Sequence, residues 1–364
     1  MRPGSAQLAK TIMYNVLVFF VVGNIFYWSI PTLVAVPKIV RAVKTWISDA
    51  RSSDAPDQAW LRTHIRETGA LRTVYRSYVE WRQSATNGET INVEGPYLQR
   101  RTVNERTSGE KKAYFFGGST MWGVGADDAR TIPSQFAALT GIHSENFGEL
   151  SYTAHQGLLL LIQLLQNGHR PDLVVFYDGV NDALHKCRNE LGADSHERES
   201  QFRFVMQNSA RPDSFSYYFA PILNLAQKVN LELSRAARQD QYDCPRNPAK
   251  AEAISDHLVS DWRFAKQLVE MHGGTFIGLL QPVIYFSQTR VEGVPLPKEF
   301  GDQYRLIYPM VRKKIAGIPG LYDITSVLDV DEAIYIDFCH LTPAGNRYVA
   351  QRVAEIVAAR GGIR

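Results

Sequence analysis

The sequence predicts an α/β domain in which a parallel sheet is covered by helices on both faces. From residue 111 onward, short apolar runs alternate with longer amphipathic segments, which is the rhythm of successive β-α units. The run at 173–176 is continuously apolar, as expected for a strand buried on both faces of a sheet.

The expected elements follow one another in a regular order. We expect strands at 111–117, 144–148, 171–179, 275–283 and 320–324, and helices at 131–141, 152–168, 251–274, 299–317 and 343–361. Thr131 and Gly141 are typical residues for the start and the end of a helix. Ahead of these elements, residues 51–86 have apolar side chains at helical spacing and residues 91–104 alternate like extended chain. A helical piece is also expected at 214–237.

Composition excludes several classes of protein. The 364 residues carry a formal net charge of +3, and the basic residues form no concentrated face, so no nucleic-acid partner is expected. The three cysteines, Cys187, Cys244 and Cys339, lack the spacing of a zinc knuckle or a redox pair. The residues alone leave open whether Cys187 and Cys244 form a bridge or remain two thiols.

The N-terminal region predicts a membrane anchor. Residues 11–37 contain no charged side chain before Lys38, and a helix needs about 20 largely apolar residues to cross a bilayer. No small-residue cleavage site is evident, so we expect an uncleaved signal anchor that contacts the lipid bilayer. The alternative is a helix buried in the core.

The expected organisation is therefore that of a single-pass membrane protein. It has an N-terminal tail at 1–10, the transmembrane anchor at 11–37, a juxtamembrane region at 38–110 and the main domain at 111–364, with an insertion around 187–250. The positive-inside rule would leave the main domain in the cytoplasm, because more basic residues follow the anchor than precede it. The difference is small, and the terminal amine offsets one charge.

Polar residues follow several of the predicted strands. Ser119 comes after the first strand in "FFGGSTMWG", Asn181 after the third in "YDGVNDA", and Asp337 and His340 stand near the end in "IYIDFCHLTPAG". On a helical turn, a spacing of three residues would place Asp337 and His340 on one side. Each signal alone fits an ordinary turn or surface pair, but the carboxyl ends of parallel strands form one ligand-binding edge.

Taken together, these blocks resemble those of the SGNH (GDSL-like) hydrolase family, over roughly residues 111–360. "GGSTMWG" matches the nucleophile block with Ser119, "GVND" matches a later block with Asn181, and "DFCH" matches the final block with Asp337 and His340. The resemblance implies a flavodoxin-like, three-layer α/β/α sandwich. It also implies a catalytic triad of Ser119, His340 and Asp337, with no metal and no cofactor.

Two positions depart from the family pattern. Gly118 stands where the family usually has aspartate, and Ser151 stands where the family has the last glycine of its second block. The resemblance implies an oxyanion hole made by the N–H groups of Ser119 and Ser151 and the amide of Asn181, with Gly148 nearby. A serine at position 151 is strained if the loop requires a positive φ.

Four other residues are weaker candidates for the site. His155 fits a locally bonded histidine better than a base, and His185 fits a pocket residue and an exposed one equally well. Gln281 ends the fourth strand, where a strand-end hydrogen bond is the simpler expectation than a substrate contact. Cys339 is expected to pack or to form a bridge rather than to act as a nucleophile.

The resemblance implies a membrane-anchored serine esterase or deacylase that acts on an ester, such as O-acyl groups of an envelope carbohydrate. Two alternatives remain: an O-acetyltransferase of an envelope polysaccharide, and a non-catalytic carbohydrate-binding or assembly protein. Anchored relatives act mostly on envelope polymers, which favours a periplasmic or extracytoplasmic main domain and a Cys187–Cys244 disulfide. The sequence identifies no protein partner.

Overall fold

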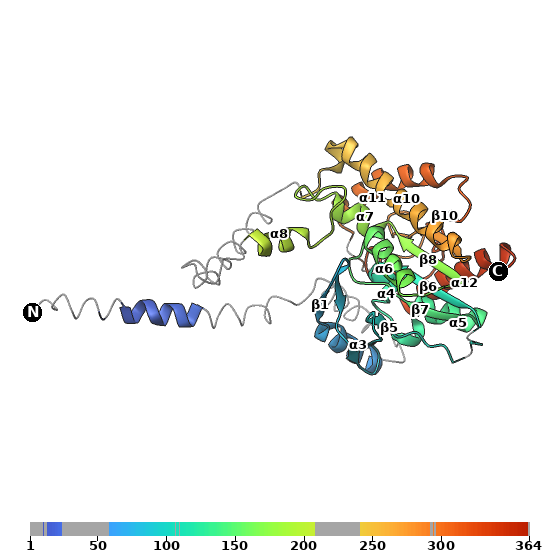
Figure 1. Cartoon of the computed structure of the whole chain (residues 1–364). Coiled ribbons are helices and arrows are strands. Elements are labelled where there is room, and N and C mark those ends of the chain that lie inside the picture. The colour runs from blue at the N-terminus through green and yellow to red at the C-terminus, as the bar shows by residue number, and fades with distance from the viewer. Residues whose placement is uncertain are drawn as a thin grey trace, which may run out of the picture. The chain divides into compact units, whose positions relative to one another are not determined.

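The computed structural model describes residue 10, residues 13–23, residues 58–207 except 106 and 109, and residues 241–362 except 292, 293 and 295. The chain divides into two compact units. The first comprises Met1–Pro37 and Arg198–Gln241, and the second comprises Lys38–Glu197 and Tyr242–Arg364. The described parts of the first unit are a helix at 13–23, drawn in blue in Figure 1, and α8 (Glu199–Gln207).

The predicted anchor at 11–37 lies mostly outside the described residues, as does the helical piece expected at 214–237. Within the part that is described, residues 13–23 are helical. Most of their apolar side chains are exposed, and Phe19, for example, is 70% exposed. Among the helices that the structure describes, none is both long and apolar enough to span a bilayer. The anchor therefore stays a prediction.

The second unit is built on an eight-stranded sheet with the order β10-β9-β8-β6-β7-β5-β4-β3. Five of these strands are parallel neighbours: β6 (Lys112–Gly117), β7 (His143–Asn146), β8 (Leu173–Asp178), β9 (Thr275–Leu280) and β10 (Leu321–Asp323). Numbered along the chain, these five lie in the order 2-1-3-4-5, which is the flavodoxin-like arrangement. The five expected strands and this topology are confirmed.

The sheet is mixed rather than purely parallel, which corrects the sequence prediction. Three short strands, β3 (Thr86–Asn87), β4 (Asn92–Glu94) and β5 (Gln99–Arg100), extend it beyond β7 with antiparallel pairing. Connections of a few residues can join only antiparallel strands, whereas parallel neighbours need a long crossover. Part of the region expected to flank the main domain thus belongs to its sheet.

Helices cover both faces of the sheet and complete three layers. The main helices are α5 (Ile132–Thr140), α6 (Ala154–Gln166), α7 (Val180–Lys186), α10 (Pro248–Met271), α11 (Lys298–Ile315) and α12 (Pro343–Ala359), and the five expected helices are confirmed among them. Helices α5 and α12 pack on each other, and α10 packs on α6 and α11 (Figure 1).

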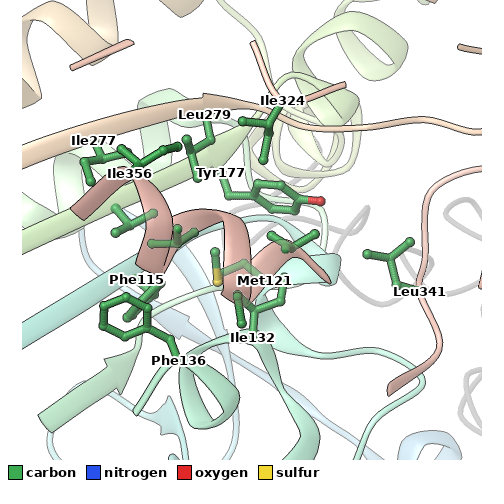
Figure 2. Close-up of a cluster of buried hydrophobic side chains, with 14 of the residues drawn as sticks. Phe115, Met121, Ile132, Phe136, Tyr177, Ile277, Leu279, Ile324, Leu341 and Ile356 are labelled. Atoms are coloured by element: carbon green, nitrogen blue, oxygen red, sulfur yellow. The ribbon is translucent and has the colours of Figure 1, made fainter. Parts of the chain in front are cut away.

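Alternate residues of the strands face the two helical layers. Phe115, Tyr177 and Leu279 point into the cluster that contains Phe136 of α5 and Ile356 of α12, as Figure 2 shows. Their neighbours along the same strands face the other layer. Phe116 stacks on Phe176 there, and a Cβ on Gly157 of α6 would lie 3.1 Å from the Phe176 ring. Because both faces of these strands are covered, successive side chains in the middle of each strand are apolar.

Residues 51–86 were expected to be helical, and the structure corrects this in their second half. Helix α3 (Gln58–Ala70) ends after Gly69, and β1 (Thr73–Arg76) and β2 (Glu80–Gln83) then form an antiparallel hairpin. The β-branched and aromatic residues of β1 favour extended chain, and pairing with β2 outweighs the helical spacing of the apolar residues.

A disulfide closes the base of the predicted insertion. Cys187 and Cys244 are bridged, with Cα atoms 5.2 Å apart, and both are fully buried. Lys250 strengthens this closure, since its ammonium donates to Arg188 O and to the Asp243 carboxylate, both at 2.8 Å. The predicted pairing is confirmed, and Cys339 is a buried free thiol.

Candidate active site

Ser119 lies at the carboxyl edge of the sheet, where a sharp turn leads from β6 into the short helix α4 (Ser119–Trp122). The turn approaches β8 closely, because a Cβ on Gly117 would lie 2.5 Å from Tyr177 O. Gly117 also has a φ of +153°. The glycine thus permits a close packing that fixes where the chain leaves the sheet, and Ser119 is the first residue after the turn.

Ser119, His340 and Asp337 form a continuous hydrogen-bonded chain. The Ser119 Oγ lies 2.7 Å from His340 Nε2, and His340 Nδ1 lies 2.6 Å from Asp337 Oδ2. Ser119 and His340 are 9% and 6% exposed. A carboxylate on Nδ1 fixes the tautomer with a free Nε2 acceptor, which is the form that can take a proton from a serine hydroxyl.

The segment that carries Asp337 and His340 is a tight loop and not the helical turn that their spacing suggested. The loop is closed by an antiparallel bridge between Tyr335 and Leu341 and by the hydrogen bond from Ile336 N to His340 O at 2.8 Å. The carboxylate itself folds the loop, because Asp337 Oδ1 accepts the N–H groups of Cys339 and His340 at 2.9 and 2.8 Å.

These contacts keep Asp337 ionised. Burial by itself would raise the pKa of Asp337, but the adjacent His340 imidazole and the two backbone N–H groups outweigh burial, so the pKa lies below its ordinary value. In contrast, burial and the nearby Asp337 charge raise the pKa of the Cys339 thiol well above its ordinary value. Cys339 therefore stays protonated and is no rival nucleophile, although its Sγ lies 3.7 Å from His340 Nδ1.

The backbone N–H groups of Ser119 and Ser151 are available to an incoming oxyanion. Within the described chain, no protein acceptor takes the N–H of Ser119 or that of Ser151. Ser151 lies in the loop after β7 and has a φ of +66°, so the strain expected for a serine at this position is present. Gly148 of the same loop packs against α4, since a Cβ there would lie 2.6 Å from Trp122 N.

Asn181 brings an amide to the same place. It lies in the first turn of α7, and its Nδ2 donates to Tyr152 O at 2.7 Å. This bond fixes which end of the carboxamide is the NH₂ group, because only a donor satisfies a carbonyl oxygen. The second amide hydrogen remains for a ligand. The structure thus gathers all of the predicted site residues at one edge of the sheet.

The weaker candidates behave as ordinary local residues. His155 pairs with Asp261 at 3.0 Å, and His185 lies half-buried on α7. Gln281 makes a structural contact and donates from Nε2 to Thr120 Oγ1 at 2.9 Å, and Thr120 Oγ1 lies 3.3 Å from Cys339 O. Gln281 therefore supports the loop of the histidine, which is consistent with the simpler expectation for this residue.

Sequence reasoning missed several residues around the site. The sequence pattern gives Thr120 no role beyond its place next to Ser119 and marks Gly118 only as a departure from the family pattern. No pattern points to Arg82 and Glu149, which are both almost fully buried. Nothing in the local sequence distinguishes these two from ordinary surface charges; their pairing becomes visible only when the chain is folded.

Comparison with known proteins gives distant structural similarities. No family model and no curated protein matches the sequence. Three similar solved structures are a carbohydrate acetylesterase family member from Sinorhizobium meliloti (15% identity, 68% of this chain and 98% of the other covered, TM-score 0.39), a member of the lipolytic protein G-D-S-L family from Veillonella parvula (10%, 68% and 98%, 0.39) and an inhibitor-bound aryl esterase of M. smegmatis (13%, 68% and 99%, 0.38). At these identities and TM-scores, the comparisons assign no activity to this chain.

Proposed function

We propose that the protein is a serine ester hydrolase that works through an acyl-enzyme on Ser119. The observation that carries this proposal is the chain from Ser119 Oγ through His340 to Asp337, with distances of 2.7 and 2.6 Å. A serine hydroxyl is a weak nucleophile unless a positioned base takes its proton, and an oriented imidazole is such a base. The non-catalytic alternative leaves this hydrogen-bonded geometry and the free N–H groups without a role.

The reaction has two steps. Ser119 Oγ attacks the ester carbonyl carbon while His340 Nε2 takes the hydroxyl proton, and the resulting imidazolium faces the ionised Asp337. The oxyanion accepts hydrogen bonds from Ser119 N, Ser151 N and Asn181 Nδ2. The tetrahedral intermediate then collapses, the alcohol leaves with the proton from His340, and water removes the acyl group by the same route in reverse.

We further propose that the ester is an O-acyl group on an envelope carbohydrate. The sequence resemblance to SGNH hydrolases, which include carbohydrate deacetylases, supports this substrate class. The buried Cys187–Cys244 disulfide supports a location outside the cytoplasm, where such bonds persist. The uncharged residues 11–37 support a single-pass anchor that holds the domain at the membrane.

The test follows two products at once. The full-length protein in detergent is incubated with p-nitrophenyl acetate, with and without an acetyl-free polysaccharide, and both acetate and acetylated sugar are measured. Acetate release, together with fluorophosphonate labelling that is absent from Ser119→Ala, is expected. Transfer of acetyl to the sugar without acetate release would instead identify an acyltransferase, and labelling that persists in Ser119→Ala would exclude Ser119 as the nucleophile.

A further inference from the structure

In the loop after β7, one backbone N–H group differs from the others, because all the others donate to an acceptor within the protein. The N–H groups of Phe147 and Glu149 donate to Phe115 O and Gly117 O, at 2.8 and 3.0 Å. Those of Gly148 and Leu150 donate to the side chains of Asn146 and Glu149, at 3.0 and 2.7 Å. The Tyr152 N–H donates to Glu149 O at 3.3 Å.

Ser151 is the exception in this loop. Its N–H has no protein acceptor in the described chain, and its backbone is in the left-handed region, where residues other than glycine are strained. A strained conformation persists only where the surroundings fix it more strongly than the strain opposes it. Contacts of the residues before and after Ser151 must therefore fix its backbone conformation.

One segment, residues 79–83, holds both sides. The Trp81 indole donates to Leu150 O at 3.1 Å. The Tyr152 hydroxyl shares its one hydrogen between Val79 O, at 2.8 Å, and Trp81 O. The Trp81 and Tyr152 rings pack edge to face, with centroids 5.4 Å apart. Leu150, before Ser151, is thus anchored to strand β2. Tyr152, after Ser151, is anchored to β2 and to the turn that precedes it.

A buried charge pair ties the same segment to the rest of the loop. Arg82 donates from Nη1 to Phe147 O and Gly148 O, at 3.0 and 3.3 Å, and its Nε lies 3.6 Å from Glu149 Oε2. Glu149 in turn accepts the backbone and side-chain amides of Gln83, at 2.9 and 3.0 Å. Both charged side chains are 1% exposed or less. Separating the two side chains would be costly, because each would be left as an uncompensated charge away from water.

Strain elsewhere in the described chain adjoins this segment. Among the described residues, the non-glycine positions with positive φ are Tyr78, Glu80, Leu98 and Ser151. Tyr78 and Glu80 lie within or beside the segment, and the Leu98 carbonyl accepts a hydrogen bond from Arg82 Nη2 at 3.1 Å. Strain that collects around one loop, beside a free N–H group, indicates a position that is fixed for function rather than for packing alone.

We infer that Arg82 and Glu149 are positioning residues, which act with Trp81 and Tyr152 to hold Ser151 in the left-handed conformation and so present its N–H to the oxyanion. This inference rests on the proposed esterase function. It explains how a serine stands where the resembling family has glycine, since the hairpin enforces a backbone conformation that glycine would adopt without help. The negative charge on the oxygen develops only as the serine attacks, so the positioning is expected to act on kcat.

The test measures kcat and KM of the full-length protein with p-nitrophenyl acetate. Two mild variants are each made with the natural Ser151 and with Ser151→Gly. Tyr152→Phe removes one anchoring hydroxyl, and Glu149→Gln neutralises the buried carboxylate at constant shape. Each is expected to lower kcat about tenfold with KM nearly unchanged, a fraction of the roughly 10²–10³-fold loss on removing an oxyanion donor. In the Ser151→Gly background, where the left-handed conformation is unstrained, the same changes are expected to lower kcat only about twofold.

Tyr114→Phe is the matched control, because it removes the hydroxyl of another buried tyrosine, the one that bonds His169 at 2.8 Å, and is expected to leave kcat unchanged. Equal losses of kcat in the serine and glycine backgrounds, or a change in KM alone, would overturn the inference while the esterase function stands. A wild-type protein that neither turns over esters nor reacts with fluorophosphonate would overturn both. If Glu149→Gln does not fold, the Tyr152→Phe pair alone decides between these outcomes.

Discussion

Gly118 leaves the space that the carboxamide of Asn181 occupies. A Cβ on Gly118 would lie 2.5 Å from Asn181 Nδ2, well inside the contact distance of the two atoms. The backbone at Gly118 is extended, with φ −80° and ψ −157°, so the requirement for glycine comes from the neighbouring amide and not from the torsion angles. Gly118, one of the two positions that depart from the family pattern, therefore has a specific steric role next to Ser119.

This relationship predicts that Gly118→Ala lowers kcat by displacing the Asn181 amide. We expect a loss of roughly 10–10² for Gly118→Ala and roughly 10²–10³ for Asn181→Ala, measured with p-nitrophenyl acetate. The double variant should be no slower than Asn181→Ala, because both changes remove the same hydrogen bond. Multiplicative losses in the double variant would show that Gly118 acts on something other than the amide.

The Asp337–His340 contact predicts a large kinetic effect of a small change. Asp337→Asn keeps the shape of the side chain but favours the imidazole tautomer with its proton on Nε2, which cannot accept the serine proton. We expect kcat to fall about 10⁴-fold, as in other triads, with the melting temperature as a check on folding. Retention of more than a tenth of the activity would mean that Asp337 does not orient His340.

The lowered pKa of Asp337 predicts how its contribution to stability depends on pH. Because the folded-state pKa lies below the unfolded value of about 3.9, ionised Asp337 stabilises the fold above about pH 4 and loses this effect as the pH falls through the folded-state pKa. Urea unfolding of wild type and Asp337→Asn between pH 3 and 7 measures this. The difference in the free energy of unfolding should shift against the wild type as the pH falls below about 4. A constant difference throughout would contradict the shift.

The disulfide predicts a stability change that is separable from activity. Replacing Cys187 and Cys244 by alanine opens a loop with a sequence separation of 57 residues, and we expect a loss of about 2–4 kcal/mol in the free energy of unfolding. Dithiothreitol should lower the melting temperature of the wild type and leave that of the double variant unchanged. Equal free energies of unfolding of the oxidised wild type and the double variant would mean that the bridge adds no stability.

Much of the fold was predictable because it follows from local patterns. Contiguous apolar runs marked β6, β8 and β9, and Thr131 and Gly141 cap the two ends of α5, with Thr131 accepting the Ser134 N–H and Gly141 in the left-handed conformation. The hairpin of β1 and β2 was missed because Leu71, Val74 and Val79 also fit a helical period. The decision between helix and hairpin depends on contacts with a loop some 70 residues further along the chain, such as the Trp81–Leu150 bond, which no local window contains.

The candidate site likewise has a part that could be predicted from the sequence and a part that could not. Ser119 and Asn181 were predictable from their places after strands, and Asp337 and His340 from their match to the final block of the resembling family. The structure brings all four together. The expected helical turn between Asp337 and His340 was wrong, because the Asp337 carboxylate takes up the N–H groups of Cys339 and His340 and so stabilises a tight loop instead. Arg82 and Glu149 were invisible, since a sequence does not show which charges will be buried together.

Ser119 and His340 are 221 positions apart along the chain. During synthesis from the N-terminus, a polypeptide that has grown through β6, β7 and β8 already contains the nucleophile but not its base, which is added shortly before the final helix. Incomplete chains and C-terminally degraded fragments therefore carry an inert hydroxyl at this turn. In the proposed esterase, reactivity toward esters therefore arises only once the segment that carries His340 has docked beside Ser119.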